Sequence, residues 1–269
     1  MSIDNITVRI ADEGDAQAVA ALLSDEGKSR YWKGSEQWNH FYRDYPEGRA
    51  VSLIAEIDNR IVGHYGLLPV RLGQWPALLG MHAYVAHGFR GLTVISALMQ
   101  EADRYATASG AKAICGFANP QFSLIKKTFF KWKIPFWLGF KLPIGHEDLL
   151  AQETPFYFSY SKEWFVWRFG SNKNAYISRY AATDGMVKKQ LLKVFPGSAL
   201  PSESELSDCE GWSRQFLYSQ KQPNVPCQPF SVKAYDQELV SAGIYDPSKW
   251  FIEMGDSDTF SYVEWKDGL

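Results

Sequence analysis

The sequence YVAHGFRGLTVISAL at residues 84–98 places the end of a strand, a glycine-containing turn and the start of a helix directly after one another. Residues 77–86 have the apolar composition of a strand, and residues 92–109 carry apolar side chains at nearly helical spacing. A turn of this kind presents several backbone N–H groups, and the following helix adds the positive end of its dipole. Arg90 adds a fixed positive charge. The stretch therefore predicts an anion-binding site that suits a pyrophosphate.

The segments on either side predict a sheet covered by helices. Strands are expected at 6–10, 50–57, 60–68, 77–86 and 111–117, and helices at 16–23, 35–45, 92–109 and 120–130. This order is β-α-α-β-β-β-α-β-α over about the first 130 residues, by the same pattern rules. An antiparallel meander that leads into a β-α-β unit predicts an α/β fold (α+β) with a mixed sheet.

Composition narrows the class of protein. The 269 residues carry a formal net charge of −2, so no overall basic field favours a nucleic acid or an anionic membrane as partner. Three cysteines without a CxxC pair argue against a disulfide framework and against a metal site built on cysteine. The first residues lack the pattern of a signal peptide, and the strongest apolar run is too short to span a bilayer. We expect a cytoplasmic protein without membrane insertion.

Residues 90–95, RGLTVI, resemble the signature Gln/Arg-x-x-Gly-x-Gly/Ala of the GNAT (Gcn5-related N-acetyltransferase) superfamily. Thr93 and Ile95 stand where the family has its two glycines. A second block, residues 111–132, has the family's order of strand, asparagine, helix and aromatic turn. The resemblance covers roughly residues 3–140 and is strongest to bacterial members associated with surface-polysaccharide or sugar modification.

The resemblance implies a GNAT fold that binds acetyl-CoA or another acyl-CoA as co-substrate. Two strands separate in that fold, and a backbone N–H at the gap stabilises the oxyanion of the thioester while an amine attacks. The residues that it assigns to binding the co-substrate are Val85, Arg90, Gly91, Leu92, Thr93, Val94 and Asn119.

The attacking amine must lose a proton, and His82 is the first candidate base because a neutral imidazole has a suitable pKa. Tyr84 shares a strand face with His82 by the period of two and is a second candidate catalytic residue. His64 and Tyr65 in the preceding strand come next. A packed or substrate-facing His82 is the competing interpretation.

Many GNAT proteins carry a tyrosine in the helix after the asparagine, where it protonates the leaving thiolate. Lys126 stands there by spacing, so the role is either unfilled or taken by Ser123. Asn119 is as good a helix cap as a ligand. The lysines around residues 126–133 form a basic cluster that fits either a phosphate or a solvated face.

The sequence predicts two parts: a GNAT acyl-CoA-binding domain at 1–140, and residues 141–269 closing the acceptor site. The second part is either an extension or a degenerate GNAT-like half. The expected acceptor is a primary amine on a small molecule, such as an amino sugar, by family resemblance alone. Two alternatives remain: a GNAT-like binding protein with a decayed coenzyme A site, and an aminoacyl-tRNA-dependent transferase on the same fold. The oligomeric state is left open.

Overall fold

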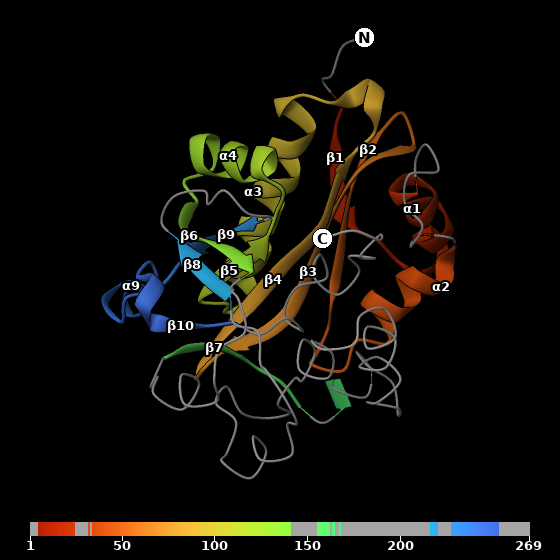
Figure 1. The fold of residues 1–269 in the computed structure, drawn as a ribbon. Coiled ribbons are helices and arrows are strands. Elements are labelled where there is room, and N and C mark those ends of the chain that lie inside the picture. Colours follow the sequence, from red (N-terminus) through yellow and green to blue (C-terminus); the bar gives the residue numbers. More distant parts are fainter. Residues whose placement is uncertain are drawn as a thin grey trace, which may run out of the picture.

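The computed structural model of the chain describes residues 5–24, 32, 34–140, 155–161, 163–164, 167, 216–219 and 227–252. Its described strands form one sheet with helices on both faces (Figure 1). The strands are β1 Thr7–Ile10, β2 Val51–Ile57, β3 Arg60–Leu72, β4 Trp75–Val85, β5 Ala113–Phe117, β6 Lys133–Phe140, β7 Phe156–Ser159, β8 Phe216–Ser219, β9 Cys227–Ala234 and β10 Trp250–Phe251. The helices are α1 Ala16–Leu23, α2 Ser35–Trp38, α3 Leu92–Ser109, α4 Pro120–Phe129 and α9 Gln237–Ser241.

The sheet is mixed, as predicted. Its strand order is β1-β2-β3-β4-β5-β9-β6-β8, with β7 paired to the end of β3 and β10 paired to β7. The pairs from β1 to β4 are antiparallel, and β4 and β5 run parallel because α3 crosses over between them. The mixed α/β fold expected from the sequence is therefore confirmed.

The helices divide between the two faces of the sheet. Figure 1 shows α1 and α2 on one face, and α3 and α4 on the other. The apolar side chains of α3 recur at Val94, Leu98 and Ala102, so that one stripe of the helix is buried against the sheet. Each face has its own hydrophobic cluster, one containing α1 and the other containing α3.

The predicted order of elements over the first 130 residues is confirmed, although one helix differs in its geometry. The helix expected at 35–45 consists of α2 and a following π-helical turn at Asn39–Arg43. This turn places two consecutive aromatic residues, Phe41 and Tyr42, among the buried side chains. A regular α-helix would separate such neighbours by about 100° around its axis.

The described part of the C-terminal half contributes to the same sheet. Strand β9 lies between β5 and β6 and is antiparallel to both. Rings of Phe136 on β6 and Phe230 on β9 stack with centroids 5.1 Å apart. The division at residue 140 stays a prediction, and most of the second part predicted at 141–269 lies outside the described residues.

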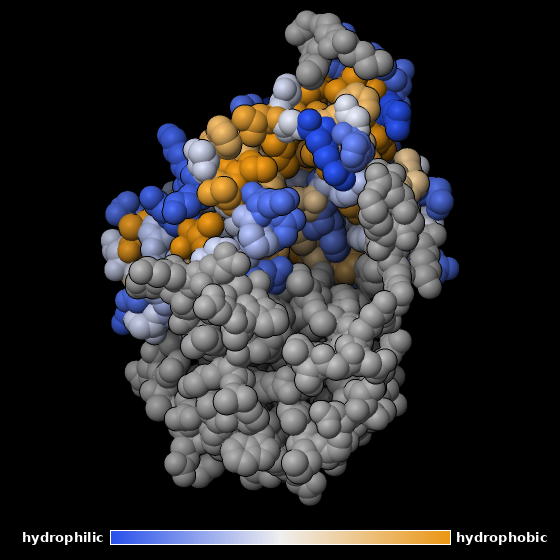
Figure 2. All heavy atoms as spheres, turned by 45° about the horizontal axis from the view of Figure 1, so that its top comes forward, coloured by the Kyte–Doolittle hydropathy of each residue, from blue (hydrophilic) through white to orange (hydrophobic). Residues whose placement is uncertain are grey.

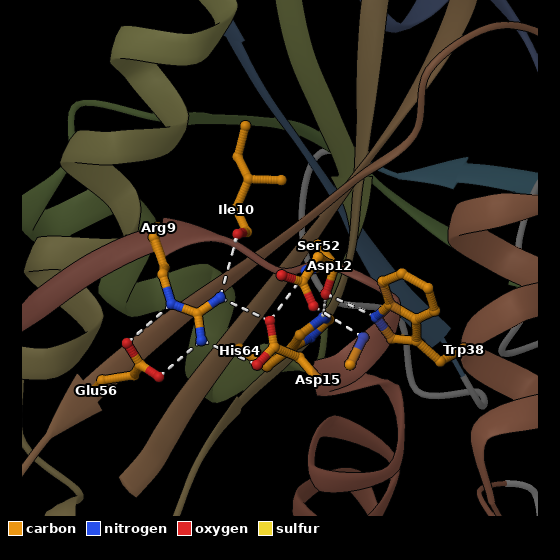
Figure 3. A network of polar contacts seen from close by, with 9 residues as sticks. Arg9, Ile10, Asp12, Asp15, Trp38, Ser52, Glu56 and His64 are labelled. Carbon is orange, nitrogen blue, oxygen red and sulfur yellow. Dashed lines mark hydrogen bonds and ion pairs between the residues drawn. The ribbon is translucent and has the colours of Figure 1, made fainter. Parts of the chain in front are cut away.

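A charged network fixes the edge strand β1 to its neighbour (Figure 3). Arg9 donates to both carboxylate oxygens of Asp15 at 2.6 and 2.9 Å, and to Glu56 on β2 at 2.8 and 2.9 Å. Asp15 in turn accepts from the backbone N–H of Asp12. Bidentate contacts of this kind fix orientation as well as adding energy.

Candidate active site

Strands β4 and β5 pair briefly and then separate. Their register contains Leu78 with Ile114 and Leu79 with Cys115. Beyond that point β4 continues along β3 to Val85, and β5 continues along β9. The divergence thus runs along the second half of β4, up to the turn and helix that the sequence predicts to bind an anion.

Two glycines allow the strands to approach closely where they begin to separate. A Cβ on Gly116 of β5 would lie 2.6 Å from the carbonyl oxygen of Gly80 on β4. A Cβ on Gly80 would in turn collide with the hydroxyl of Tyr65. The close approach of the two strands therefore requires glycine at Gly116, whereas Gly80 leaves room for the side chain of Tyr65.

A β-bulge in β4 determines where His82 points. His64 pairs with Tyr84 and Gly66 with Met81, so Tyr65 of β3 faces two residues of β4. The extra residue is His82, whose φ is +51°. Strict alternation would direct His82 to the α3 side, and the bulge turns it to the α1 side instead.

The ring of His82 is held by aromatic residues on that side. Its Nδ1 lies 2.9 Å from the hydroxyl oxygen of Tyr42, a hydrogen-bond distance. The rings of Phe41 and Trp32 meet it edge-on, with centroids 4.6 and 4.9 Å away. His82 is half-buried, so the predicted base has a fixed orientation and some access to solvent. Sequence reasoning missed Tyr42, whose only signal was its place in an aromatic helix.

His64, the next candidate base, is enclosed in the fold. The indole N–H of Trp38 donates to the hydroxyl of Ser52, which lies 2.9 Å from Nε2 of His64. The other ring nitrogen lies 2.8 Å from the carbonyl oxygen of His82 (Figure 3 shows the first part of this chain). Burial lowers the pKa of His64 to about 3. His64 is therefore neutral at physiological pH and supports the bulge.

Strand β4 directs one backbone donor toward the diverging edge. The N–H of Ala86 donates to the carbonyl of Val62 on β3 at 2.8 Å, and Tyr84 pairs in the same ladder. Hydrogen-bonded pairs alternate in an antiparallel ladder, so the N–H of Val85 points away from β3. That edge faces the side from which β5 has separated.

The start of α3 has the geometry of an anion site. Gly91 is the N-cap and offers no side-chain hydrogen bond, and a Cβ on it would meet open space. The first N–H groups of a helix lack intrahelical partners, and here they belong to Leu92, Thr93 and Val94. Thr93 is exposed, whereas the side chain of Val94 is buried and offers only its backbone.

Arg90 connects this helix start to the strand. Its Nε lies 3.3 Å from the carbonyl oxygen of Val85, and its guanidinium carbon lies 5.7 Å from the centroid of the Tyr84 ring. The structure thus brings Arg90 and Val85, both predicted to bind the co-substrate, together with Tyr84, a candidate catalytic residue. Ile95, in place of a family glycine, is buried in the core.

Large apolar side chains are exposed on α3 and on α4. Leu92 on α3 is 43% exposed, and Leu124 and Phe129 on α4 are 61% and 54% exposed. Figure 2 turns the top of Figure 1 forward and shows hydrophobic groups gathered on that face among hydrophilic ones.

On the β5 side, Asn119 and Ser123 have different surroundings. Asn119 is exposed and caps α4 by accepting from the N–H of Phe122 at 2.8 Å. Ser123 is fully buried, and within the described residues its hydroxyl has no hydrogen-bond partner. Asn119 therefore acts as a cap in this structure, and its role in binding a co-substrate stays a prediction.

Lys126 is a buried residue that the sequence did not single out as such. It is 1% exposed, whereas Lys127 beside it is exposed. Its Nζ lies 4.0 Å from the ring centroid of Trp132 and 4.9 Å from that of Phe122. Burial lowers the pKa of Lys126 to about 7. Two adjacent lysines in a sequence predict a solvated face on which both are exposed. Only tertiary packing buries Lys126 and leaves Lys127 exposed.

Among the described residues, no group of three or more histidine, cysteine, aspartate or glutamate side chains could hold a metal ion. None of the helices in the described part is long and apolar enough to cross a membrane.

Comparison with known families and structures gives partial matches. Residues 17–123 match the model of the acetyltransferase (GNAT) family, which supports this superfamily for that part of the chain. Comparison with curated proteins gives no match.

Comparison with solved structures gives matches at low identity. A conserved protein of unknown function from Enterococcus faecalis V583, a probable N-acyltransferase, is 12% identical over 66% of this chain and 43% of its own, with a TM-score of 0.45. This chain thus spans less than half of that protein. A GNAT acetyltransferase from Streptococcus pneumoniae is 15% identical over 53% of this chain and 91% of its own, with a TM-score of 0.42. Glucosamine-6-phosphate N-acetyltransferase from Arabidopsis thaliana is 12% identical over 46% of this chain and 89% of its own, with a TM-score of 0.38.

Proposed function

We propose that this protein, through the GNAT-like part at residues 17–123, transfers an acyl group from acetyl-CoA or another acyl-CoA to a primary amine of a small molecule. The observation that carries the proposal is the divergence of β4 from β5 beside the uncapped start of α3. A thioester between the strands and a pyrophosphate on the helix would both find donors there.

The positions of several predicted residues support binding roles for them. The N–H groups of Leu92, Thr93 and Val94 and the charge of Arg90 would hold the pyrophosphate. Open space at Gly91 leaves room for phosphate oxygens. Thr93 can add its hydroxyl, which compensates in part for the missing family glycine.

The chemical step would use two residues at the C-terminal end of the bulged strand, Val85 and His82. The amine attacks the thioester carbonyl, a C–N bond forms, and the N–H of Val85 stabilises the oxyanion. His82 accepts the proton of the amine at Nε2 while Nδ1 donates to Tyr42. The C–S bond then breaks, and the leaving thiolate takes up a proton from solvent. Ser123, the residue predicted for this proton transfer, is a fully buried neutral hydroxyl, and its role stays a prediction. Tyr84 would border the reacting groups beside Arg90.

The finer parts of the proposal rest on resemblance. We propose an amino sugar or another small cytoplasmic amine as acceptor, with residues 141–269 closing the acceptor side. The family match supports acyl transfer in general, and it leaves the acceptor unspecified.

Calorimetry with acetyl-CoA tests the proposal. We expect micromolar binding that weakens about tenfold in Arg90→Ala, because a charged hydrogen bond contributes about 1.5–3 kcal/mol. Arg104→Ala is the matched control, since Arg104 is an exposed arginine further along α3. Failure of the wild type to bind acetyl-CoA or longer acyl-CoAs would refute the proposal. Binding of aminoacyl-tRNA instead would favour the transferase that uses that donor.

A further inference from the structure

Three buried polar groups lie together without the partners that such groups normally have. The hydroxyls of Tyr65 and Ser123 are fully buried, and neither has a hydrogen-bond partner among the described residues. Nζ of the buried Lys126 lies over the rings of Trp132 and Phe122, and among the described residues it forms no hydrogen bond or ion pair. The great majority of buried polar groups in proteins have a hydrogen-bond partner, because an unpaired one costs free energy.

The three groups converge on one place between α4 and the sheet. Ser123 and Lys126 are three residues apart on α4, so they share a helix face. Nζ of Lys126 lies 5.6 Å from the ring centroid of Tyr65 on β3. The faces of Trp132 and Phe122 attract the ammonium but offer it no acceptor oxygen.

This place is where β4 and β5 begin to separate. Nζ of Lys126 is 3.7 Å from the position that a Cβ on Gly116 would occupy. The hydroxyl of Tyr65 lies against Gly80 on the opposite strand. Both glycines directly follow the last pair between β4 and β5, so the unpaired donors lie at the inner end of the divergence.

No neighbouring carboxylate within the described residues neutralises the ammonium. Asp103 on α3, the carboxylate that acts electrostatically on Tyr65, is bonded to Lys233 at 2.6 Å and to Tyr235 at 2.5 Å. The pKa of Lys126, lowered to about 7 by burial, is the response expected of a cation that lacks a counter-charge.

We propose that Lys126 and Tyr65 form a binding site for a carboxylate, with the hydroxyl of Ser123 as a further donor. All three groups can donate hydrogen bonds, and an ionised carboxylate supplies only acceptors. If the proposed function holds, the carboxylate is the far end of an acyl chain, so a dicarboxylic acyl-CoA is the preferred donor. The other possible ligand of this site is a small free carboxylate that is not attached to coenzyme A.

Matched acyl-CoAs test the first source. Succinyl-CoA and butyryl-CoA have acyl chains of equal carbon number and differ by the terminal carboxylate. We expect calorimetry to show succinyl-CoA binding at least about tenfold more tightly to the wild type, because one charged hydrogen bond contributes that much. The preference should disappear in Lys126→Met and persist in Lys127→Met, the exposed neighbour on the same helix.

Free succinate tests the second source, with binding followed by NMR in the absence of coenzyme A. Succinate binding that depends on Lys126 would support the carboxylate site. If the protein bound succinate in this way but bound no acyl-CoA, the proposed function would be rejected and the carboxylate site would stand. The proposal is overturned if the wild type shows neither a succinyl preference nor succinate binding that Lys126→Met abolishes. Tyr65→Phe, which removes only an unpaired hydroxyl, should reduce the same preference several-fold and serves if Lys126→Met does not fold.

Discussion

The burial of His64 makes the stability of the fold depend on pH. His64 in the folded protein has a pKa of about 3, against 6.5 for an ordinary histidine. Between these values the unfolded chain binds a proton that the folded chain does not, so stability falls as the pH falls. Above the unfolded value the contribution of His64 is fully present. From pH 7.5 to pH 5 the loss amounts to about 2 kcal/mol, at roughly 1.4 kcal/mol per pH unit.

Replacing His64 by glutamine tests this reasoning. His64→Gln removes the titration, and it disturbs the contacts to Ser52 and to the carbonyl of His82. We expect a stability lower by about 1–3 kcal/mol at pH 7.5, because a buried polar partner is left unsatisfied. The further loss between pH 7.5 and pH 5 should be about 2 kcal/mol smaller than in the wild type.

Urea unfolding followed by tryptophan fluorescence measures both quantities, since the chain has 10 tryptophans. His87→Gln is the matched control, because His87 is exposed and its replacement should keep the pH dependence of the wild type. If His64→Gln had the same pH dependence as the wild type, another group would cause the loss of stability between pH 7.5 and pH 5.

Two further substitutions test the packing of the sheet by urea unfolding. Gly116→Ala should cost about 1–3 kcal/mol, because the new Cβ would meet the carbonyl of Gly80 at 2.6 Å. Gly88→Ala, into open space, should change stability by less than about 0.5 kcal/mol, and equal effects would contradict the close approach of the strands. Phe136→Ala should cost about 3–5 kcal/mol, because the ring is fully buried against Phe230. A cost below about 1 kcal/mol would show that β6 and β9 do not share a packed core.

Local patterns in the sequence were enough to predict the first part of the fold. Apolar periodicity located α3, and Gly110 at its end adopts the left-handed conformation expected of a helix terminus. The turn at 87–91 was predicted correctly because glycine and the switch from strand to helix period are signals carried by neighbouring residues. Arg90 was found near the start of α3 for the same reason.

The candidate site depended more on contacts between distant segments. The bulge at His82 exists because Tyr65 on another strand faces two residues of β4, and no pattern within β4 announces it. The bond between His82 and Tyr42 joins residues 40 positions apart. Pairing of this kind is decided by packing, which a sequence pattern does not contain.

The sequence by itself determined the order of elements, the mixed sheet and the turn before α3, since each depends on residues close together in the chain. Tertiary structure alone decided that β9 lies between β5 and β6, and that Lys126 is buried while Lys127 is exposed. The physical reason is the same in both cases. Strand neighbours and the burial of a charged side chain depend on which surfaces meet after folding, and the residues paired between β5 and β9 are more than 100 positions apart in the sequence.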